Sequence, residues 1–146
     1  MKGKDPGERF VYLPHTADCM FQAYGKTIEE AFCNAVLAMT NYLTPVDKIP
    51  AKMFKKVSVS AARRETLLYD FLEQILYFID AEGFLSSTVQ KLKITLAGGK
   101  YHLIATIGGD SYKDYELHGD IKAITYSDML IKEEKGKWIV QVVLDI

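Results

Sequence analysis

The chain has 146 residues, 49% of them apolar and 25% charged, which is the size and composition of one globular domain, and we expect a single domain over residues 1–146. Its 18 basic and 19 acidic residues give a formal net charge of −1, which excludes a globally basic nucleic-acid-binding protein but leaves room for a local basic patch. Because no apolar run reaches the roughly 18 residues of a membrane span, and Met1–Asp5 lacks the apolar core of a signal peptide, we expect a protein of the cytoplasm, or of the nucleus in a eukaryote, without a membrane partner.

Two short strands are predicted at the start of the chain, over residues 9–13 and 19–24. Pro14 ends the first strand, because it has no backbone donor and favours an extended residue before it. The chain should then turn and enter the second strand, which Gly25 closes.

Two amphipathic helices with a strand between them are predicted next. Thr27 and Glu30 have the spacing of a capping box, and apolar residues at helical spacing follow over residues 28–43. A strand over residues 54–60 leads into a second helix over residues 64–81, which has a broad apolar stripe. The polar members of this second helix are predicted to form a solvated face: Glu65, Asp70, Glu73 and Gln74.

From Leu85 onward the chain is predicted to form short strands in hairpins. Alternating apolar residues flank Gly98-Gly99, and a second glycine pair, Gly108-Gly109, is expected to separate two further strands. Residues 121–131 and 137–145 form the last hairpin. Two helices and about seven strands, mostly in meander order, predict an α+β fold: a two-layer sandwich with both helices packed on one face of a mixed, mainly antiparallel sheet.

The turn between the first two strands carries two candidate functional side chains, those of His15 and Asp18, with Thr16 between them. The ordinary interpretation is a turn in which the Asp18 carboxylate or the Thr16 hydroxyl accepts a backbone N–H, and in which His15 bonds to the backbone. A functional interpretation requires further carboxylates to converge on the turn.

Such carboxylates occur at the end of the last predicted strand. Strand side chains alternate between two faces, and Asp145 lies on the more polar one. Ile146 follows it, and its α-carboxyl group is ionised at neutral pH. The ordinary interpretation of Asp145 and Ile146 is that they end a packed strand at the protein surface. The opposite, apolar face consists of Trp138, Val140, Val142 and Leu144.

The remaining cysteines and histidines carry no recognisable motif. Cys19 and Cys33 form no Cys-x-x-Cys pair and are predicted on a strand and a helix, which favours small buried apolar residues over a disulfide or a zinc site. We assign no role to His102 or His118.

Three ordered segments form a pattern that covers both ends of the chain. They are Pro14-His15-Thr16-Ala17-Asp18, Lys122-Ala123-Ile124-Thr125-Tyr126 and Leu144-Asp145-Ile146. Together with Tyr24-Gly25, the Ile28–Met39 helix and Leu67-Leu68-Tyr69, they resemble the archease family, small proteins that activate the RtcB-type RNA ligase of tRNA splicing. The chain departs from many family members at Asp120, where they carry Glu, and at Ser127, where they carry His.

The resemblance implies a protein that is not itself an enzyme. It implies an activator that promotes GTP-dependent guanylylation of the ligase and multiple turnover, with Asp120 and Lys122 serving the activation. It also implies that Asp18, Asp145 and the α-carboxylate of Ile146 bind a divalent cation, which the resemblance suggests is calcium.

The chemistry of calcium is consistent with this implied site. Calcium takes about six to eight oxygen ligands, so three carboxylates leave positions for water or for a partner's groups. His15 is expected to support the ligands without binding the ion, because hard cations prefer oxygen. Lys122 or a protonated His15 would offset the mutual repulsion of the three anions when the metal is absent.

Two other functions remain open. The first is a metal-dependent phosphoesterase or nuclease that uses Asp18, Asp120 and Asp145, although the sequence shows neither a phosphate-binding loop nor a paired acid and base. The second is an RNA-binding adaptor, which the balanced net charge disfavours and whose binding would fall steeply with added salt. For ligase activation itself, any contact with RNA is expected to be indirect.

Overall fold

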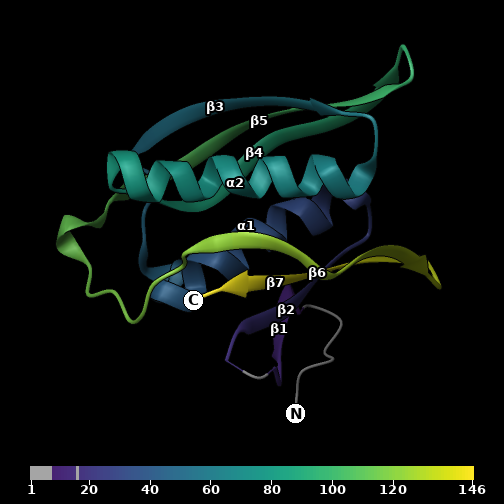
Figure 1. The fold of residues 1–146 in the computed structure, drawn as a ribbon. Helices are drawn as coiled ribbons and strands as arrows, with labels where there is room; N and C mark the ends of the chain where they lie inside the picture. The colour runs from purple at the N-terminus through teal and green to yellow at the C-terminus, as the bar shows by residue number, and fades with distance from the viewer. Residues whose placement is uncertain (1–7, 16) are drawn as a thin grey trace.

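The computed structural model describes residues 8–15 and 17–146, which form seven strands, two α-helices and two short 3-10 turns at Val46–Lys48 and Tyr112–Asp114 (Figure 1). Neither α-helix of this described part is long and apolar enough to span a membrane. In chain order the elements are β1 (Phe10–Leu13), β2 (Cys19–Gly25), α1 (Ile28–Leu43), β3 (Met53–Ala61), α2 (Arg64–Glu82), β4 (Phe84–Ala97), β5 (Lys100–Ser111), β6 (Ala123–Glu134) and β7 (Lys137–Asp145).

The strands form two sheets, and both helices lie between them (Figure 1). One sheet has the strand order β1-β2-β7-β6 and the other β3-β5-β4, and every strand pair within the described residues is antiparallel. The predicted α+β class is confirmed. The structure differs from the prediction in having a sheet on either side of the helices, where a single mixed sheet with one covered face was expected.

Two buried polar residues of α1 show how one helix serves both sheets. The Asn34 amide donates to the carbonyl oxygen of Tyr24 in β2 at 2.7 Å, and the Thr40 hydroxyl donates to the carbonyl oxygen of Ser86 in β4 at 2.5 Å. A buried polar side chain is tolerated when it has such a partner. The two bonds therefore fasten α1 to a strand of each sheet.

The helix ends follow the predicted local signals. The Thr27 hydroxyl accepts the backbone N–H of Glu30 at 3.1 Å, while the Glu30 carboxylate accepts the N–H of Lys26 at 2.6 Å, one residue before the partner of a standard capping box. Helix α2 ends at Gly83, whose φ of +61° is the left-handed conformation typical of a glycine cap.

The Gly108-Gly109 pair lies inside β5 and does not separate two strands, which corrects the sequence prediction. A side chain at Gly109 would run into the carbonyl of Leu85, and one at Gly108 into the hydroxyl of Thr88. The glycines thus allow β4 to approach β5 closely. β4 also has irregular pairing at residues 86–88 and 90–93. The strand is 14 residues long, whereas the sequence predicts shorter strands here.

Strand β7 is central in its sheet, between β2 and β6. On its predicted apolar face, Val140, Val142 and Leu144 are fully inaccessible to solvent and Trp138 is half-buried. Val143 on the other face is also buried, with 1% of its surface exposed. Asp145 is exposed, so the strand passes from full burial to solvent within one residue.

Candidate metal and partner site at the end of strands β2 and β7

The pairing of β2 with β7 brings the two predicted side-chain ligands to the same end of one sheet. Cys19 pairs with Leu144, so Asp18 and Asp145 are the next residues beyond that pair. These two residues are far apart in the sequence, and the antiparallel register alone makes them neighbours. The structure therefore places the turn after β1 beside the end of the last strand.

If the β2–β7 register is continued by one residue beyond Cys19, where β2 begins, Asp18 and Asp145 fall on the same face of the sheet. Met20 pairs with Val143, and residues two positions further along each strand lie on the same side as that pair. Opposite residues in antiparallel strands have Cβ atoms about 4.5–5.5 Å apart, a spacing at which two carboxylates can reach one cation.

The start of β6 fixes the backbone at the end of β7. The N–H of Lys122 donates to the carbonyl oxygen of Asp145 at 2.7 Å, and Ala123 pairs with Asp145. The Ile146 side chain packs against the core and is half-buried. The main chain is thereby held on both sides of Asp145, while its side chain remains exposed.

His15 lies between two carboxylates. Its Nδ1 is 3.4 Å from Oδ2 of Asp18, and its Nε2 is 3.5 Å from Oδ2 of Asp128. The Nδ1 contact is electrostatic rather than a well-formed hydrogen bond, because this buried nitrogen has no partner in hydrogen-bonding geometry among the described residues. The predicted backbone-bonded imidazole is replaced by one that contacts acidic side chains. Thr16, whose hydroxyl is the other predicted acceptor in the turn, lies outside the described residues.

Asp128 is a candidate that the sequence did not reveal. It has a φ of +52° and lies where the β6–β7 pairing is irregular, between Thr125 and Leu130. Tyr126 in the same irregular segment stacks on Tyr69 of α2, with ring centroids 4.2 Å apart. The only sequence signal was the polar Ser127-Asp128 pair in an otherwise alternating strand.

Asp120 and Lys122 lie on the segment that leads into β6, and both are exposed. The charge of Asp120 acts on Asp80 of α2: burial, and secondarily this neighbouring negative charge, raise the pKa of the Asp80 carboxyl above its ordinary value. Asp120 therefore lies close enough to α2 to influence a carboxylate there. In the part of the chain that the structure describes, no three His, Cys, Asp or Glu side chains form a group suited to a metal ion.

The residues present fit a hard cation on the chemistry of their donors. Asp18 and Asp145 offer only oxygen, which calcium prefers, and the proposed set adds the α-carboxylate of Ile146 as a third oxygen donor. The Asp18 side chain is 33% exposed, so water or a partner's group can also reach this carboxylate. A hollow of about 290 Å³ opens beside it, between β1, β2 and α1.

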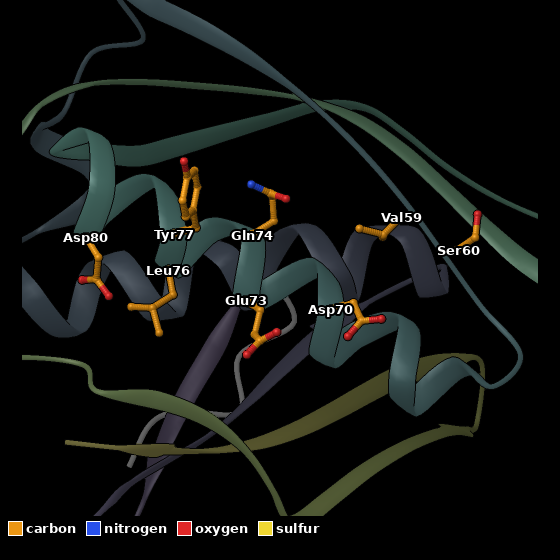
Figure 2. Close-up of a pocket in the computed structure, with 8 residues that line it drawn as sticks. All are labelled: Val59, Ser60, Asp70, Glu73, Gln74, Leu76, Tyr77 and Asp80. Atoms are coloured by element: carbon orange, nitrogen blue, oxygen red, sulfur yellow. The ribbon is translucent and has the colours of Figure 1, made fainter.

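A second hollow, of about 650 Å³, lies along α2 and is separate from these residues (Figure 2). The side chains of Asp70, Glu73 and Asp80 project from one side of the helix, while Gln74 and Tyr77 project from the other (Figure 2). Asp70 and Glu73 of the predicted solvated face therefore share one side of the helix, whereas Gln74, predicted with them, lies on the other side. An acidic row of this kind is no ligand site by itself, and we assign none.

Comparison with known proteins identifies the family. The family model described as Archease protein family (MTH1598/TM1083) matches residues 10–146. The protein archease of Methanosarcina mazei is 34% identical over 96% of this chain and 97% of its own length. The protein archease of Pyrococcus furiosus is 39% identical over 94% of this chain and 99% of its own length.

Two solved structures share the fold. The solution structure of Methanobacterium thermoautotrophicum protein 1598 is 32% identical and has a TM-score of 0.81, covering 94% of this chain and 99% of that one. The crystal structure of a Thermotoga maritima protein, described as an archease and possible chaperone, has a TM-score of 0.55 at 19% identity and covers 92% and 94% of the two chains. Since both the sequence and the fold match over nearly the whole length, this chain belongs to the archease family.

Proposed function

We propose that this protein activates an RNA ligase of the RtcB type. It would promote the transfer of guanylate from GTP to the ligase's active-site histidine, with release of pyrophosphate, and so restore multiple turnover in tRNA splicing in the cytoplasm. Membership of the archease family supports an accessory role of this kind. The Thermotoga maritima relative is described as a possible chaperone, which is also a role exercised on a partner protein.

The ion site in this proposal consists of Asp18, Asp145 and the α-carboxylate of Ile146, with calcium as the ion. The observation that carries it is the β2–β7 register, which makes Asp18 and Asp145 neighbours at one end of the sheet. Three carboxylates supply part of a shell of about six to eight oxygens. The open positions would be completed by water or by groups of the ligase, so the ion would form part of the contact between the two proteins.

His15 would hold the Asp18 carboxylate in position. Carboxylates that bind metals are commonly oriented by a further contact, and His15 provides one at 3.4 Å. Asp128 on the other side of the ring would in turn fix the imidazole. Without the ion, a protonated His15 would also reduce the repulsion among the surrounding carboxylates.

Lys122 and Asp120 would act on the ligase. Both side chains are exposed, and the backbone N–H of Lys122 is bonded to Asp145 at 2.7 Å. In the proposed site, this bond would hold the main chain of the lysine next to that of Asp145. Such a lysine can meet a negatively charged group of the partner without losing its position.

The phosphoesterase alternative gains no support from the described residues. It requires Asp18, Asp120 and Asp145 to act together, but no three His, Cys, Asp or Glu side chains form a group suited to a metal ion within residues 8–15 and 17–146.

The decisive experiment measures multiple-turnover RNA ligation and ligase guanylylation, with and without this protein, in calcium and after chelation. We expect stimulation by wild-type protein, a large loss for Asp18→Asn, and full stimulation by Asp114→Asn, which changes an exposed carboxylate in the turn Tyr112–Asp114. No stimulation by the wild-type protein would reject the proposed function. Stimulation that chelation and Asp18→Asn leave unchanged would reject the ion site.

A further inference from the structure

The charges of this protein are unevenly distributed, although they nearly cancel overall. Strands β3, β4 and β5 contain five lysines and a single carboxylate, Asp110. The Asp110 side chain is 9% exposed, accepts a hydrogen bond from the Tyr115 hydroxyl at 2.9 Å and lies 3.7 Å from Lys52. The three-stranded sheet is therefore basic, and the remainder of the chain is correspondingly acidic.

Four of the five lysines are exposed on the side of this sheet that faces away from the helices. The fifth, Lys55, is turned toward the helices and lies 2.6 Å from Glu82 of α2. None of the other four forms an ion pair with any residue in the described part of the chain. We call this surface the basic face; its lysines are Lys56, Lys91, Lys93 and Lys100.

The irregular pairing in β4 contributes to this arrangement. Gln90 pairs with Thr106 and Lys93 with Ile104, so two residues three positions apart share the outward side. A regular strand would place them on opposite sides. The bulge instead buries Leu92 and turns Lys93 outward, and it holds Lys91 at a φ of +56°, a backbone conformation unusual for lysine.

No helix covers the basic face, since α1 and α2 both lie on the other side of the sheet (Figure 1). Apolar side chains are exposed among the lysines: Phe54 is 53% and Ile104 is 55% exposed. A hollow of about 350 Å³ lies on this face, and its outward lining combines charge, hydroxyls and one aliphatic side chain: Lys56, Ser58, Lys91, Ile104 and Thr106.

We propose that the basic face binds a single-stranded nucleic-acid segment. Unpaired lysines on an open sheet match the phosphate backbone, hydroxyl side chains can donate to phosphate and sugar oxygens, and Phe54 offers a ring on which a base can stack. An anionic membrane would favour a cluster of protruding apolar side chains, whereas here Phe54 and Ile104 stand among serines, threonines and lysines. The inference is independent of the proposed ligase and of the ion site.

The salt dependence of binding follows from the number of lysines. On single strands, each neutralised phosphate contributes about −0.7 to the slope of log affinity against log salt. Four contacts give a slope of about −2.8, so affinity should fall about 50-fold between 50 and 200 mM salt.

The test is fluorescence anisotropy with a labelled single-stranded RNA of about 12 nucleotides, without any ligase. We expect the double variant Lys93→Gln/Lys100→Gln to bind more weakly and to reduce the magnitude of the slope by about 1.4. Phe54→Ala should weaken binding without changing the slope. The matched control, Lys26→Gln/Lys113→Gln, removes two exposed lysines outside the basic face and should bind as wild type does.

Three results would overturn the proposal: no binding at 50 mM salt, equal losses in the basic-face and control variants, or lysine-dependent binding to phosphatidylserine vesicles without binding to RNA. All substituted residues are exposed or lie on the solvent side of the sheet, so the variants should fold, and thermal melting checks this. Failure here leaves ligase stimulation unaffected, because that assay reports on a different surface.

Discussion

Nε2 of His15 lies 3.5 Å from Oδ2 of Asp128, although 113 positions separate the two residues. His15 belongs to the turn between β1 and β2, whereas Asp128 belongs to β6, and β7 lies between β2 and β6 in the sheet. The contact therefore bridges the end of the sheet, beside the strand that carries Asp145. It adds a carboxylate to the surroundings of the proposed ion.

Substituting Asp128→Asn should lower calcium affinity several-fold with little loss of stability. Asparagine tolerates the positive φ at this position, so the change removes charge without adding backbone strain. We expect the free energy of unfolding to change by no more than about 0.5 kcal/mol, as for most exposed substitutions. Calorimetric titration and thermal melting measure the two effects. Wild-type affinity in the variant would mean that Asp128 does not influence the site.

Substituting Asp18→Asn should weaken calcium binding more strongly, by at least about tenfold, or about 1.4 kcal/mol. The change replaces an anionic oxygen ligand by a neutral amide of nearly the same shape, so metal affinity should suffer more than folding. Asp114→Asn is the control and should titrate as wild type. Equal affinities in Asp18→Asn and wild type would remove Asp18 from the ligand set.

Lys122→Ala and Asp120→Ala should each reduce ligase stimulation more than thermal stability. Both side chains are exposed, and removal of an exposed charge usually changes stability by no more than about 0.5 kcal/mol. The Lys122 substitution also keeps the backbone bond to Asp145. Guanylylation of the ligase and the melting temperature are measured in parallel. Parallel losses in the two measurements would assign these residues a structural role.

Both cysteines should resist alkylation in the folded protein. Burial raises the pKa of the Cys19 thiol to about 11, and burial, together with the charges of Glu30 and Glu29, raises that of Cys33 to about 11. The reactive thiolate is therefore about a hundredfold scarcer near neutral pH than at an ordinary thiol. We expect iodoacetamide at pH 7.5 to label both residues readily only after denaturation. Rapid labelling of either cysteine in the folded protein would contradict this.

The same raised pKa values define a pH dependence of stability. The unfolded chain releases the two thiol protons at a lower pH than the folded protein does. The stabilisation of the folded state by the two protonated thiols is therefore complete below about pH 9 and declines as the pH rises towards 11. Chemical denaturation at pH 8 and pH 10 measures the difference, with Cys33→Ala as the comparison.

Extending the chain beyond Ile146 should weaken calcium binding and ligase stimulation. An extension converts the α-carboxylate into a neutral amide carbonyl, while the buried face of β7 is left intact. An N-terminal tag is the control and should have no effect. Deleting Ile146 moves the terminal carboxylate to Asp145, which conserves the number of anions but changes their reach. Native affinity and stimulation in the extended protein would exclude the α-carboxylate as a ligand.

The helices and strands could be predicted because their signals are local. The capping residues Thr27 and Glu30 and the glycine at 83 lie where the sequence places the helix ends. The second sheet could not be predicted, because Asn34 and Thr40 look like exposed polar residues of α1 until their carbonyl partners in two different sheets are known. Gly108-Gly109 was interpreted as a turn for a similar reason, since the close approach of β4 is a tertiary property.

The candidate site was predictable only in part. The proximity of Asp18 and Asp145 was expected from the family resemblance, and the register of β2 with β7 supplies a geometric basis for it. The role of Asp128 could not be predicted, because its position depends on where the pairing of β6 becomes irregular. The alternation of apolar and polar residues along a strand does not predict such a point. The basic face could not be predicted for a different reason. Net charge is a sum over the whole chain, whereas the lysines become separated from the carboxylates only when the chain folds.

The central position of β7 determines when its sheet can form during synthesis of the chain. β2 comprises residues 19–25 but pairs with a strand at residues 137–145, so its sheet cannot close until residues 137–145 have left the ribosome. Contacts between such distant residues slow folding, because a long loop must close before they are gained. Asp18 and Asp145 meet in that same late step, which ties the appearance of the proposed ion site to the completion of folding.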